Sequence, residues 1–542
     1  MLGLMQPRTM EAIAVASDPT LGMGLTTLGV LLLGITYMSG LLHRLLLRLL
    51  PVRLFPPKVR WLLLPGQLED EDAVAYREET HRHIVSQHER HGDVYVQRRN
   101  GQKVLFVRSP MAVRGVLLSR DFGKVWVTDA PSKSAAGGET VAEYVHNLVQ
   151  PLLADPVFSN KGASNASARS MMKPLFLGSA HFAAGFAAEI RSALSAWPSG
   201  EVDALKLVHD VMRSALYHAI AGPSASQLEA LASPAFHRVL DYFVNRYSVP
   251  SHEQQVTAED KVMMLELRDA AVNVVAAIRA SSRDALPKSS LLALMLDADC
   301  TDEACAAVVV NVVIAGAEAP ASALAHTLRE LARRPTCQQR LHEEVTAAIG
   351  VSCAAEHPGK AGDLSGVLDQ LDFHKAVVLE GLRLFAPATL VKRQALADTT
   401  VDGIAVPKGT VVELCVTAIH ADPKQFERPL EFIPTRDGPM SAPLIGKERA
   451  YMPFSGGNRG CPGRPLALTL MRIALASIVE RFQILPDDGD AASASDARKA
   501  DETAARVRKF IVWPSAGVPV RLERRASFSN NSASSSCIID GP

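Results

Sequence analysis

The sequence predicts a mainly α fold with a smaller β part, preceded by one N-terminal transmembrane helix. Three observations support this prediction. Long amphipathic helical patterns fill most of the chain, short β patterns are confined to two regions, and residues 21–42 carry no charged side chain. With 542 residues, of which 48% are hydrophobic and 21% charged, the composition is that of a globular protein and excludes global disorder.

Charge and cysteine content argue against nucleic acid as a partner and against a fold held by disulfides or zinc. The chain has 57 Lys and Arg and 57 Asp and Glu, so its formal net charge is zero and no global field favours nucleic acid as a partner. The seven cysteines are odd in number, scattered and without paired spacing. This pattern argues against a disulfide scaffold and against a zinc ribbon.

The apolar N-terminal segment predicts a membrane anchor. Residues 21–43 are long enough to cross the hydrocarbon core once as a helix. Basic residues and no acidic ones follow directly: Arg44, Arg48, Arg53, Lys58 and Arg60. By the positive-inside rule, the rest of the chain is expected to lie in the cytoplasm. The protein would then cross a membrane once, either that of the endoplasmic reticulum or that of a plastid. A cleaved signal peptide and a buried core helix are the alternatives, and both fit this charge flank poorly.

The remaining boundaries follow from composition. We expect an N-terminal segment over 1–20, the anchor over 21–43, a basic proline-rich hinge over 44–68, the main domain over 69–523 and a disordered tail over 524–542. In the tail, the sequence Arg-Arg-Ala before Ser527 resembles a basic-directed kinase site.

Within the main domain the elements are expected in this order. Strands at 93–97 and 103–107 flank the turn Asn100-Gly101, and short strands between 398 and 415 flank a Pro-Lys-Gly turn at 407–409. Helical patterns cover 79–90, 182–197, 203–221, 261–279, 302–333, 335–349 and 466–482. The first helix and the residue that follows it carry four histidines without the HExxH spacing, for which we expect a solvated helix face. These are His81, His83, His88 and His91.

A glycine-rich loop before the last long helix carries the strongest chemical signal. Glycines at 456, 457 and 460 precede the lone Cys461, which stands just before the predicted helix over 466–482. A sulfur at a helix N-terminus is favoured as a thiolate, and glycines let backbone N–H groups approach it. Such a thiolate is a nucleophile or a metal ligand, and a single one suits an axial position on haem iron. A buried cysteine in a glycine-rich turn is the alternative.

This loop resembles the cysteine-ligand loop of the cytochrome P-450 superfamily, the haem-thiolate monooxygenases. The signature Phe-x-x-Gly-x-Arg-x-Cys-x-Gly is matched at every fixed position, by Phe454, Gly457, Arg459, Cys461 and Gly463. The resemblance implies one haem-thiolate fold over 69–523 that binds haem b (iron protoporphyrin IX). It makes Cys461 the axial iron ligand, places Arg459 on a haem propionate and packs Phe454 beside the sulfur.

Upstream segments extend the resemblance in the family's order. Glu380 and Arg383 are three residues apart and share one helix face. The resemblance joins them to Arg436 in a structural network behind the haem, and makes Arg393 a second propionate contact. A further family motif, Trp-x-x-x-Arg, is matched at Arg169, whereas Asn165 stands where the family often has Trp.

The expected distal helix departs from the family pattern. Gly316 and Glu318 match the motif, but Ala319 replaces the hydroxyl residue and Pro320 follows. Oxygen activation on haem needs two protons, which the acid–alcohol pair supplies in the family. We therefore take Gly316, Glu318 and Ala319 as the candidate catalytic residues. We expect a proline-opened groove with Glu318 and water or a substrate hydroxyl to replace the alcohol; a helix kink with a changed role is the alternative.

The resemblance implies a monooxygenase that puts one atom of O₂ into a small lipophilic substrate such as a sterol, fatty acid, terpenoid or carotenoid. The chain has no flavin or nicotinamide fingerprint, so electrons would come from a separate NADPH–cytochrome reductase or a ferredoxin-type donor. Arg459, Arg464 and Lys173 are the predicted docking patch, with membrane lipid as a further partner. Two alternatives remain, an oxygen-independent hydroperoxide isomerase or dehydratase and a non-catalytic haem-binding membrane protein.

Overall fold

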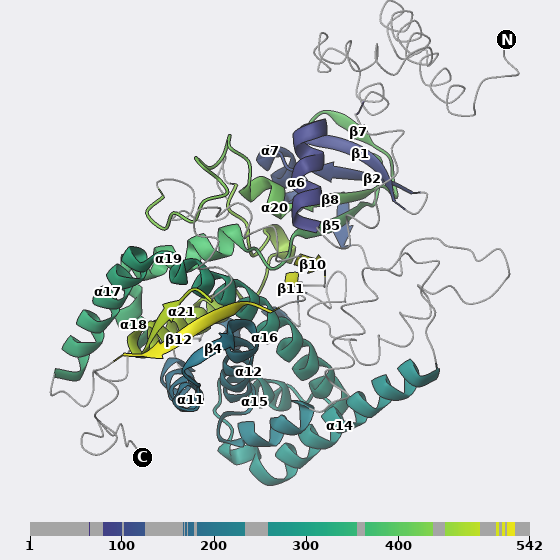
Figure 1. The fold of residues 1–542 in the computed structure, drawn as a ribbon. Coiled ribbons are helices and arrows are strands. Elements are labelled where there is room, and N and C mark those ends of the chain that lie inside the picture. The colour runs from purple at the N-terminus through teal and green to yellow at the C-terminus, as the bar shows by residue number, and fades with distance from the viewer. Residues whose placement is uncertain are drawn as a thin grey trace, which may run out of the picture.

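A computed structural model of the chain describes residues 64, 80–99, 102–124, 166, 169–170, 172–177, 182–232, 258–354, 364–436, 450–487, 506–508, 512–514 and 517–525. The predicted anchor at 21–43, almost all of the hinge and the tail beyond residue 525, with Ser527, lie outside the described residues. Within them, the expected mainly α architecture with a smaller β part is confirmed: a sheet lies at one end of a large helical part (Figure 1).

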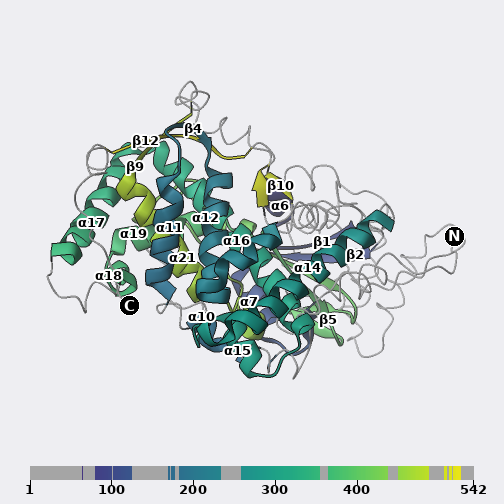
Figure 2. The same cartoon turned by 90° about the horizontal axis from the view of Figure 1, so that it is seen from below.

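The helical part is built around α16 (Asp302–Ala332), which packs against α12, α14, α19 and α21 (Figure 2). Thr301 caps its N-terminus, accepting a hydrogen bond from the Ala304 N–H at 3.3 Å. A Cβ on Gly381 of α19 would lie 2.0 Å from Thr327 Oγ1 of α16, so glycine is what lets these two helices approach. The bounds of the partners are α12 (Ala204–Ala221), α14 (Ala258–Ser282), α19 (Asp372–Leu384) and α21 (Arg464–Arg481).

Eight further helices among the described residues surround this core. They are α6 (Thr80–His91), α7 (Pro110–Leu118), α10 (Lys173–Leu177), α11 (Ala183–Ser195), α15 (Leu291–Asp297), α17 (Pro335–Ala354), α18 (Leu364–Asp369) and α20 (Val416–His420). Each long helix lies within a few residues of its predicted range, because caps and apolar periodicity mark helix ends directly in the sequence. Asp203, for example, caps α12 by accepting from the Leu205 N–H at 2.9 Å.

A five-stranded sheet has the order β1-β2-β8-β5-β3. Its strands are β1 (Val94–Arg99), β2 (Gln102–Val107), β8 (Val411–Cys415), β5 (Leu390–Ala395) and β3 (Phe122–Lys124). β2 and β8 are parallel and the other pairs antiparallel, so the sheet joins segments about 300 residues apart in sequence. It holds Arg393 on β5 opposite Val412 of β8.

Three smaller sheets complete the β part. β4 (Gly200–Asp203), β12 (Pro519–Arg524) and β9 (Phe482–Leu485) form one, β6 (Thr399–Val401) with β7 (Ile404–Val406) the second, and β10 (Arg506–Arg508) with β11 (Val512–Pro514) the third. The predicted Pro-Lys-Gly turn lies between β7 and β8, and Gly409 has a φ of 86° there.

The histidine-bearing helix α6 does not present a solvated face as expected. His83 and His88 are buried, and His88 Nδ1 lies 2.8 Å from the Gly92 carbonyl oxygen and packs edge-on against Tyr95. The prediction was wrong because α6 packs on β1 and α20, which covers the side that carries these rings.

Among the described residues, α16 is the one helix long and apolar enough to cross a membrane, and 67% of its most apolar window is buried inside the protein. Its apolar character is that of a central core helix.

Candidate functional site

The cysteine loop lies between residue 450 and α21 and is held by its own backbone. The Cys461 N–H donates to the Phe454 carbonyl at 2.9 Å, and the Gly460 N–H donates to the Gly457 carbonyl at 3.0 Å. Gly457 has a φ of 67°, and a Cβ there would lie 2.3 Å from the carbonyl oxygen of Leu117 in α7. Only glycine fits this position, so α7 and the loop are matched in shape.

The Cys461 side chain is the exposed one among the described cysteines. Burial of the sulfur raises the pKa of this thiol above its ordinary value, and backbone N–H donors from Gly463 and Arg464 together with the charge of Arg169 offset part of that rise. Because α21 begins at Arg464, the sulfur lies at the N-terminus of that helix, in the field that favours a thiolate. The thiol is therefore both accessible and supplied with donors.

A chain of three guanidinium groups, those of Arg169, Arg459 and Arg393, begins beside this sulfur. The Arg169 Nη2 donates to the Gly460 carbonyl at 2.6 Å, directly beside Cys461. Burial and the charge of Arg169 lower the pKa of Arg459. Burial, with the charge of Arg459, lowers the pKa of Arg393 to about 10. Arg459 is therefore close enough to both Arg169 and Arg393 for their positive charges to oppose one another.

Phe454 and Gly463, two further residues of the loop signature, lie near the start of α21. The Phe454 ring is half-buried, and the Arg464 guanidinium lies 6.0 Å from its centroid. A Cβ on Gly463 would lie 3.9 Å from the Cys461 Sγ and 3.7 Å from Phe176, within ordinary contact. Lys173, the third member of the predicted docking patch, is exposed on α10, whereas Arg464 is half-buried.

The candidate distal residues lie on α16, which packs against α21. Glu318 is 8% exposed and Ala319 is half-buried. A Cβ on Gly316 would lie 2.8 Å from Leu216 of α12, so α12 approaches α16 closely here. Pro320 does not end the helix, since α16 continues to Ala332.

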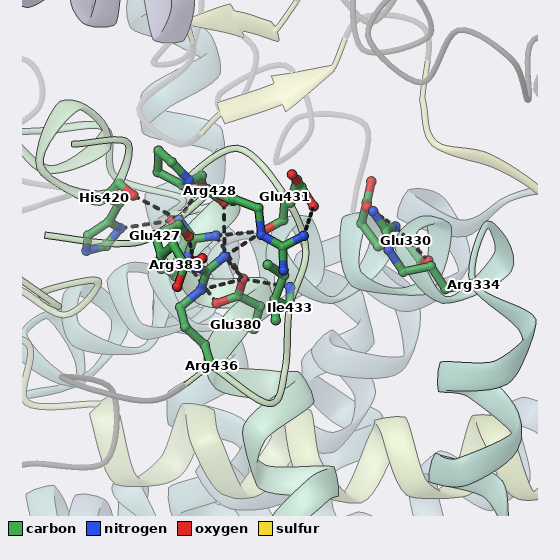
Figure 3. Close-up of polar contacts among 11 residues, drawn as sticks. Glu330, Arg334, Glu380, Arg383, His420, Glu427, Arg428, Glu431, Ile433 and Arg436 are labelled. Carbon is green, nitrogen blue, oxygen red and sulfur yellow. Dashed lines mark hydrogen bonds and ion pairs between the residues drawn. The ribbon is translucent and has the colours of Figure 1, made fainter. Parts of the chain in front are cut away.

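The acid of α19 is the centre of a buried ion network (Figure 3). Arg383 Nε and Nη2 each donate to the Glu380 carboxylate at 2.8 Å. Arg436 Nη2 lies 3.2 Å from Glu380 Oε1, and the Ile433 N–H donates to the same oxygen at 2.9 Å. The side chains of Glu380, Arg383 and Arg436 are 0%, 1% and 5% exposed.

Backbone carbonyls satisfy the rest of both guanidinium groups. Arg383 donates to the carbonyls of His420, Pro429 and Glu431 at 2.8, 2.6 and 3.0 Å. Arg436 donates to the carbonyls of Glu427, Arg428 and Glu431. The network thus fastens the irregular segment 427–436 to α19, and its buried ions are paired and hydrogen-bonded as buried charges must be.

His420 is a residue of this site that the sequence analysis missed. It is the last residue of α20 and is 2% exposed. Its ring lies between Arg383 and the backbone of Met452, at the start of the cysteine loop. A single histidine at the end of a five-residue helix carries no pattern that would mark it.

Comparison with known proteins agrees with this geometry. The Cytochrome P-450 family model matches residues 224–506, just over half of the chain. The mouse mitochondrial 25-hydroxyvitamin D-1 alpha hydroxylase is 38% identical over 184 residues, 33% of this chain and 34% of that protein. Cytochrome P-450 3A13 of mouse is 35% identical over 174 residues, 32% of this chain and 33% of that protein. The matched part spans about a third of the length of these relatives.

Solved structures extend the likeness over most of the fold. The crystal structure of the cytochrome P-450DA heme domain has a TM-score of 0.62 at 20% identity, covering 82% of this chain and 92% of that one. A crystal structure of a cytochrome P-450, CYP102L1, has a TM-score of 0.65 at 20% identity, covering 83% and 95%. Together, the family-model match and the shared fold show that this chain belongs to the cytochrome P-450 family.

Proposed function

We propose that the chain is a haem-thiolate monooxygenase that inserts one atom of O₂ into a lipophilic substrate. The observation that carries the proposal is one exposed cysteine at the N-terminus of α21, with Arg169 beside it and the charge of Arg459 opposed by both Arg169 and Arg393. A haem-thiolate site needs an anionic sulfur as the iron ligand and cationic donors for the two propionate carboxylates.

The residues present fit this group. Cys461 would bind the iron, and Arg169, Arg393 and Arg459 would hold the propionates, whose negative charge offsets the repulsion among the three cations. When bound, haem supplies the oxygen-activating chemistry, and a thiolate ligand favours cleavage of the O–O bond.

The chain's own residues hold the sulfur and move protons. The N–H groups of Gly463 and Arg464 stabilise the thiolate, and the glycine-rich backbone keeps it at the end of α21. On α16, the Glu318 carboxylate would carry the proton. Because Ala319 has no hydroxyl group, a water molecule or a hydroxyl of the substrate would replace the alcohol beside it. Glu380, Arg383 and Arg436 act as a structural network and not as catalysts.

Proton delivery is tested with Ala319→Thr. The expected result is better coupling, meaning more product for each NADPH and O₂ consumed, because the variant restores a hydroxyl next to the acid. Unchanged coupling would contradict the proposed role of Glu318 with water.

We further propose that electrons come from a separate NADPH-dependent reductase or a ferredoxin-type protein, docking over Arg459, Arg464 and Lys173. A membrane anchor over 21–43 would place the domain beside lipophilic substrates, in the endoplasmic reticulum or a plastid. The name of the mouse relative describes a hydroxylase of 25-hydroxyvitamin D, and supports a lipophilic substrate for this chain.

The reaction class is tested by supplying the haem-loaded protein with a lipophilic substrate panel under two regimes. Product with NADPH, reductase and O₂ is expected. Conversion of fatty-acid hydroperoxides without NADPH or O₂, in place of that product, would contradict a monooxygenase. Haem binding without product under either set of conditions would indicate a non-catalytic haem carrier or sensor.

A further inference from the structure

His420 makes hydrogen bonds through both ring nitrogens, and its surroundings determine which one carries the proton. The Met452 N–H donates to Nε2 at 3.0 Å, so Nε2 is the acceptor. Nδ1 therefore carries the hydrogen and donates to the Arg383 carbonyl at 2.9 Å. Burial and the charge of Arg383 lower the pKa of His420 to about 3, which keeps the ring neutral and this pattern intact.

The two partners of His420 belong to different parts of the site. Arg383 is a member of the buried ion network and also donates to the His420 carbonyl at 2.8 Å, so the two residues are joined twice. Met452 opens the cysteine loop, because its carbonyl accepts from the Ser455 N–H at 3.0 Å. Two residues further on, the Phe454 carbonyl accepts from the Cys461 N–H at 2.9 Å.

Ring contacts hold His420 in this orientation. Its ring stacks on Tyr451 with centroids 5.7 Å apart and meets Phe426 edge-on at 6.1 Å. The Tyr451 hydroxyl donates to the Leu379 carbonyl of α19 at 3.1 Å. These contacts fix the orientation of the ring. Loss of either of its hydrogen bonds would therefore leave a buried backbone group unsatisfied.

We infer that His420 is a positioning residue that fastens the start of the cysteine loop to the Glu380–Arg383–Arg436 network, through the contact of its Nε2 with the Met452 N–H. By this contact the network sets the place of the Cys461 sulfur. The inference rests on the proposed ligand role of Cys461 for its functional consequence, and on the structure alone for the contact.

Two substitutions separate the bonds of the ring. The amide oxygen of Gln reaches the position of Nε2 and can accept from Met452, whereas the amide nitrogen of Asn reaches the position of Nδ1 and keeps only the bond to Arg383. His420→Gln should therefore preserve loop positioning and His420→Asn should lose it. His374→Asn is the matched control, since His374 is equally buried and neutral but binds the Arg472 carbonyl, away from the loop.

The experiment measures amide hydrogen exchange at Met452 and haem retention in the full-length, haem-loaded protein. In the wild type the Met452 amide should be protected; exchange at the rate of an open amide would overturn the contact without any variant. His420→Asn should raise exchange at Met452 by roughly five- to ten-fold, the effect of one lost buried hydrogen bond. It should also speed haem transfer to apomyoglobin by a similar factor, while His420→Gln and His374→Asn stay within two-fold of wild type.

Equal effects of His420→Asn and His420→Gln on both readouts would overturn the inference, because a general packing role does not distinguish the two amides. Failure of the proposed function looks different. In that case wild-type protein would lack a thiolate-type spectrum, while Met452 exchange would still report on the contact.

Discussion

Replacing Glu380 by Gln should destabilise the protein more than the same change at a less buried ion pair. The carboxylate accepts from Arg383 Nε and Nη2, Arg436 Nε and Nη2 and the Ile433 N–H, at 2.8 to 3.3 Å. Gln removes the negative charge and leaves two buried guanidinium ions uncompensated. Breaking a buried ion pair from one side costs about 3–5 kcal/mol.

The cost converts to a shift in melting temperature. An unfolding entropy of about 2.1 cal/mol/K per residue over roughly 450 residues is about 0.9 kcal/mol/K, so the midpoint should fall by about 3–5 °C. The assay is thermal unfolding by circular dichroism at one scan rate, since large proteins often unfold irreversibly.

The matched control is Glu330→Gln. Glu330 is 8% exposed, but its partners Arg333 and Arg334 have side chains that are 18% and 34% exposed, so water can solvate them when the charge is removed and the loss should be smaller than for Glu380→Gln. Figure 3 shows both clusters in one view. A shift for Glu380→Gln no larger than for Glu330→Gln would refute the reasoning.

A double-mutant cycle sharpens the test. Arg436→Gln in the Glu380→Gln background removes one of the two uncompensated cations, so the double variant should melt higher than the two single shifts predict when added. The expected coupling is about 1.5–3 kcal/mol, the upper range for residues in one network. Additive shifts would mean that the three residues do not act as a unit.

Three further predictions follow from single contacts. Gly457→Ala should lower haem occupancy and melting temperature, because a Cβ there would meet the Leu117 carbonyl at 2.3 Å. The control is Gly409→Ala, where φ is 86° and no atom lies near the added Cβ, so only backbone strain of about 1–2 kcal/mol is expected. Equal losses of stability in the two variants would contradict close packing of Gly457 against α7. Arg393→Gln should weaken hemin binding by roughly ten-fold in a titration, the effect of one lost charge-assisted hydrogen bond, and unchanged affinity would remove Arg393 from the propionate site. Acidification should destabilise the fold below pH 6.5, because burial lowers the pKa of His88, His374 and His420 to about 3 and only the unfolded chain takes up these protons. Well below pH 6.5 each histidine should cost about 1.4 kcal/mol per pH unit, so a melting temperature that stays flat from pH 7.5 to 5.5 would contradict this.

Much of the helical part could be predicted because the signals are local. Thr301 and Asp203 cap α16 and α12, and apolar periodicity gives the extent of each helix. The spacing of Glu380 and Arg383 placed both on one face of a helix, which is where the structure has them.

What could not be predicted depends on contacts between distant segments. β8 pairs with β2 about 300 residues away, and this pairing, together with that of β5, brings Arg393 into the sheet. The burial of His83 and His88 comes from the packing of α6 on β1 and α20, which its own sequence does not reveal. His420 likewise gains its role only when α20, α19 and the cysteine loop meet.

The central claim is that the Cys461 sulfur binds haem iron as a thiolate. The most direct measurement is the absorption spectrum of the dithionite-reduced carbon monoxide adduct of the full-length protein and of Cys461→Ser. The account predicts the red-shifted band of thiolate ligation in the wild type and its loss in the variant. A wild-type band of the histidine-ligated kind, or a variant spectrum identical to the wild type, would contradict it.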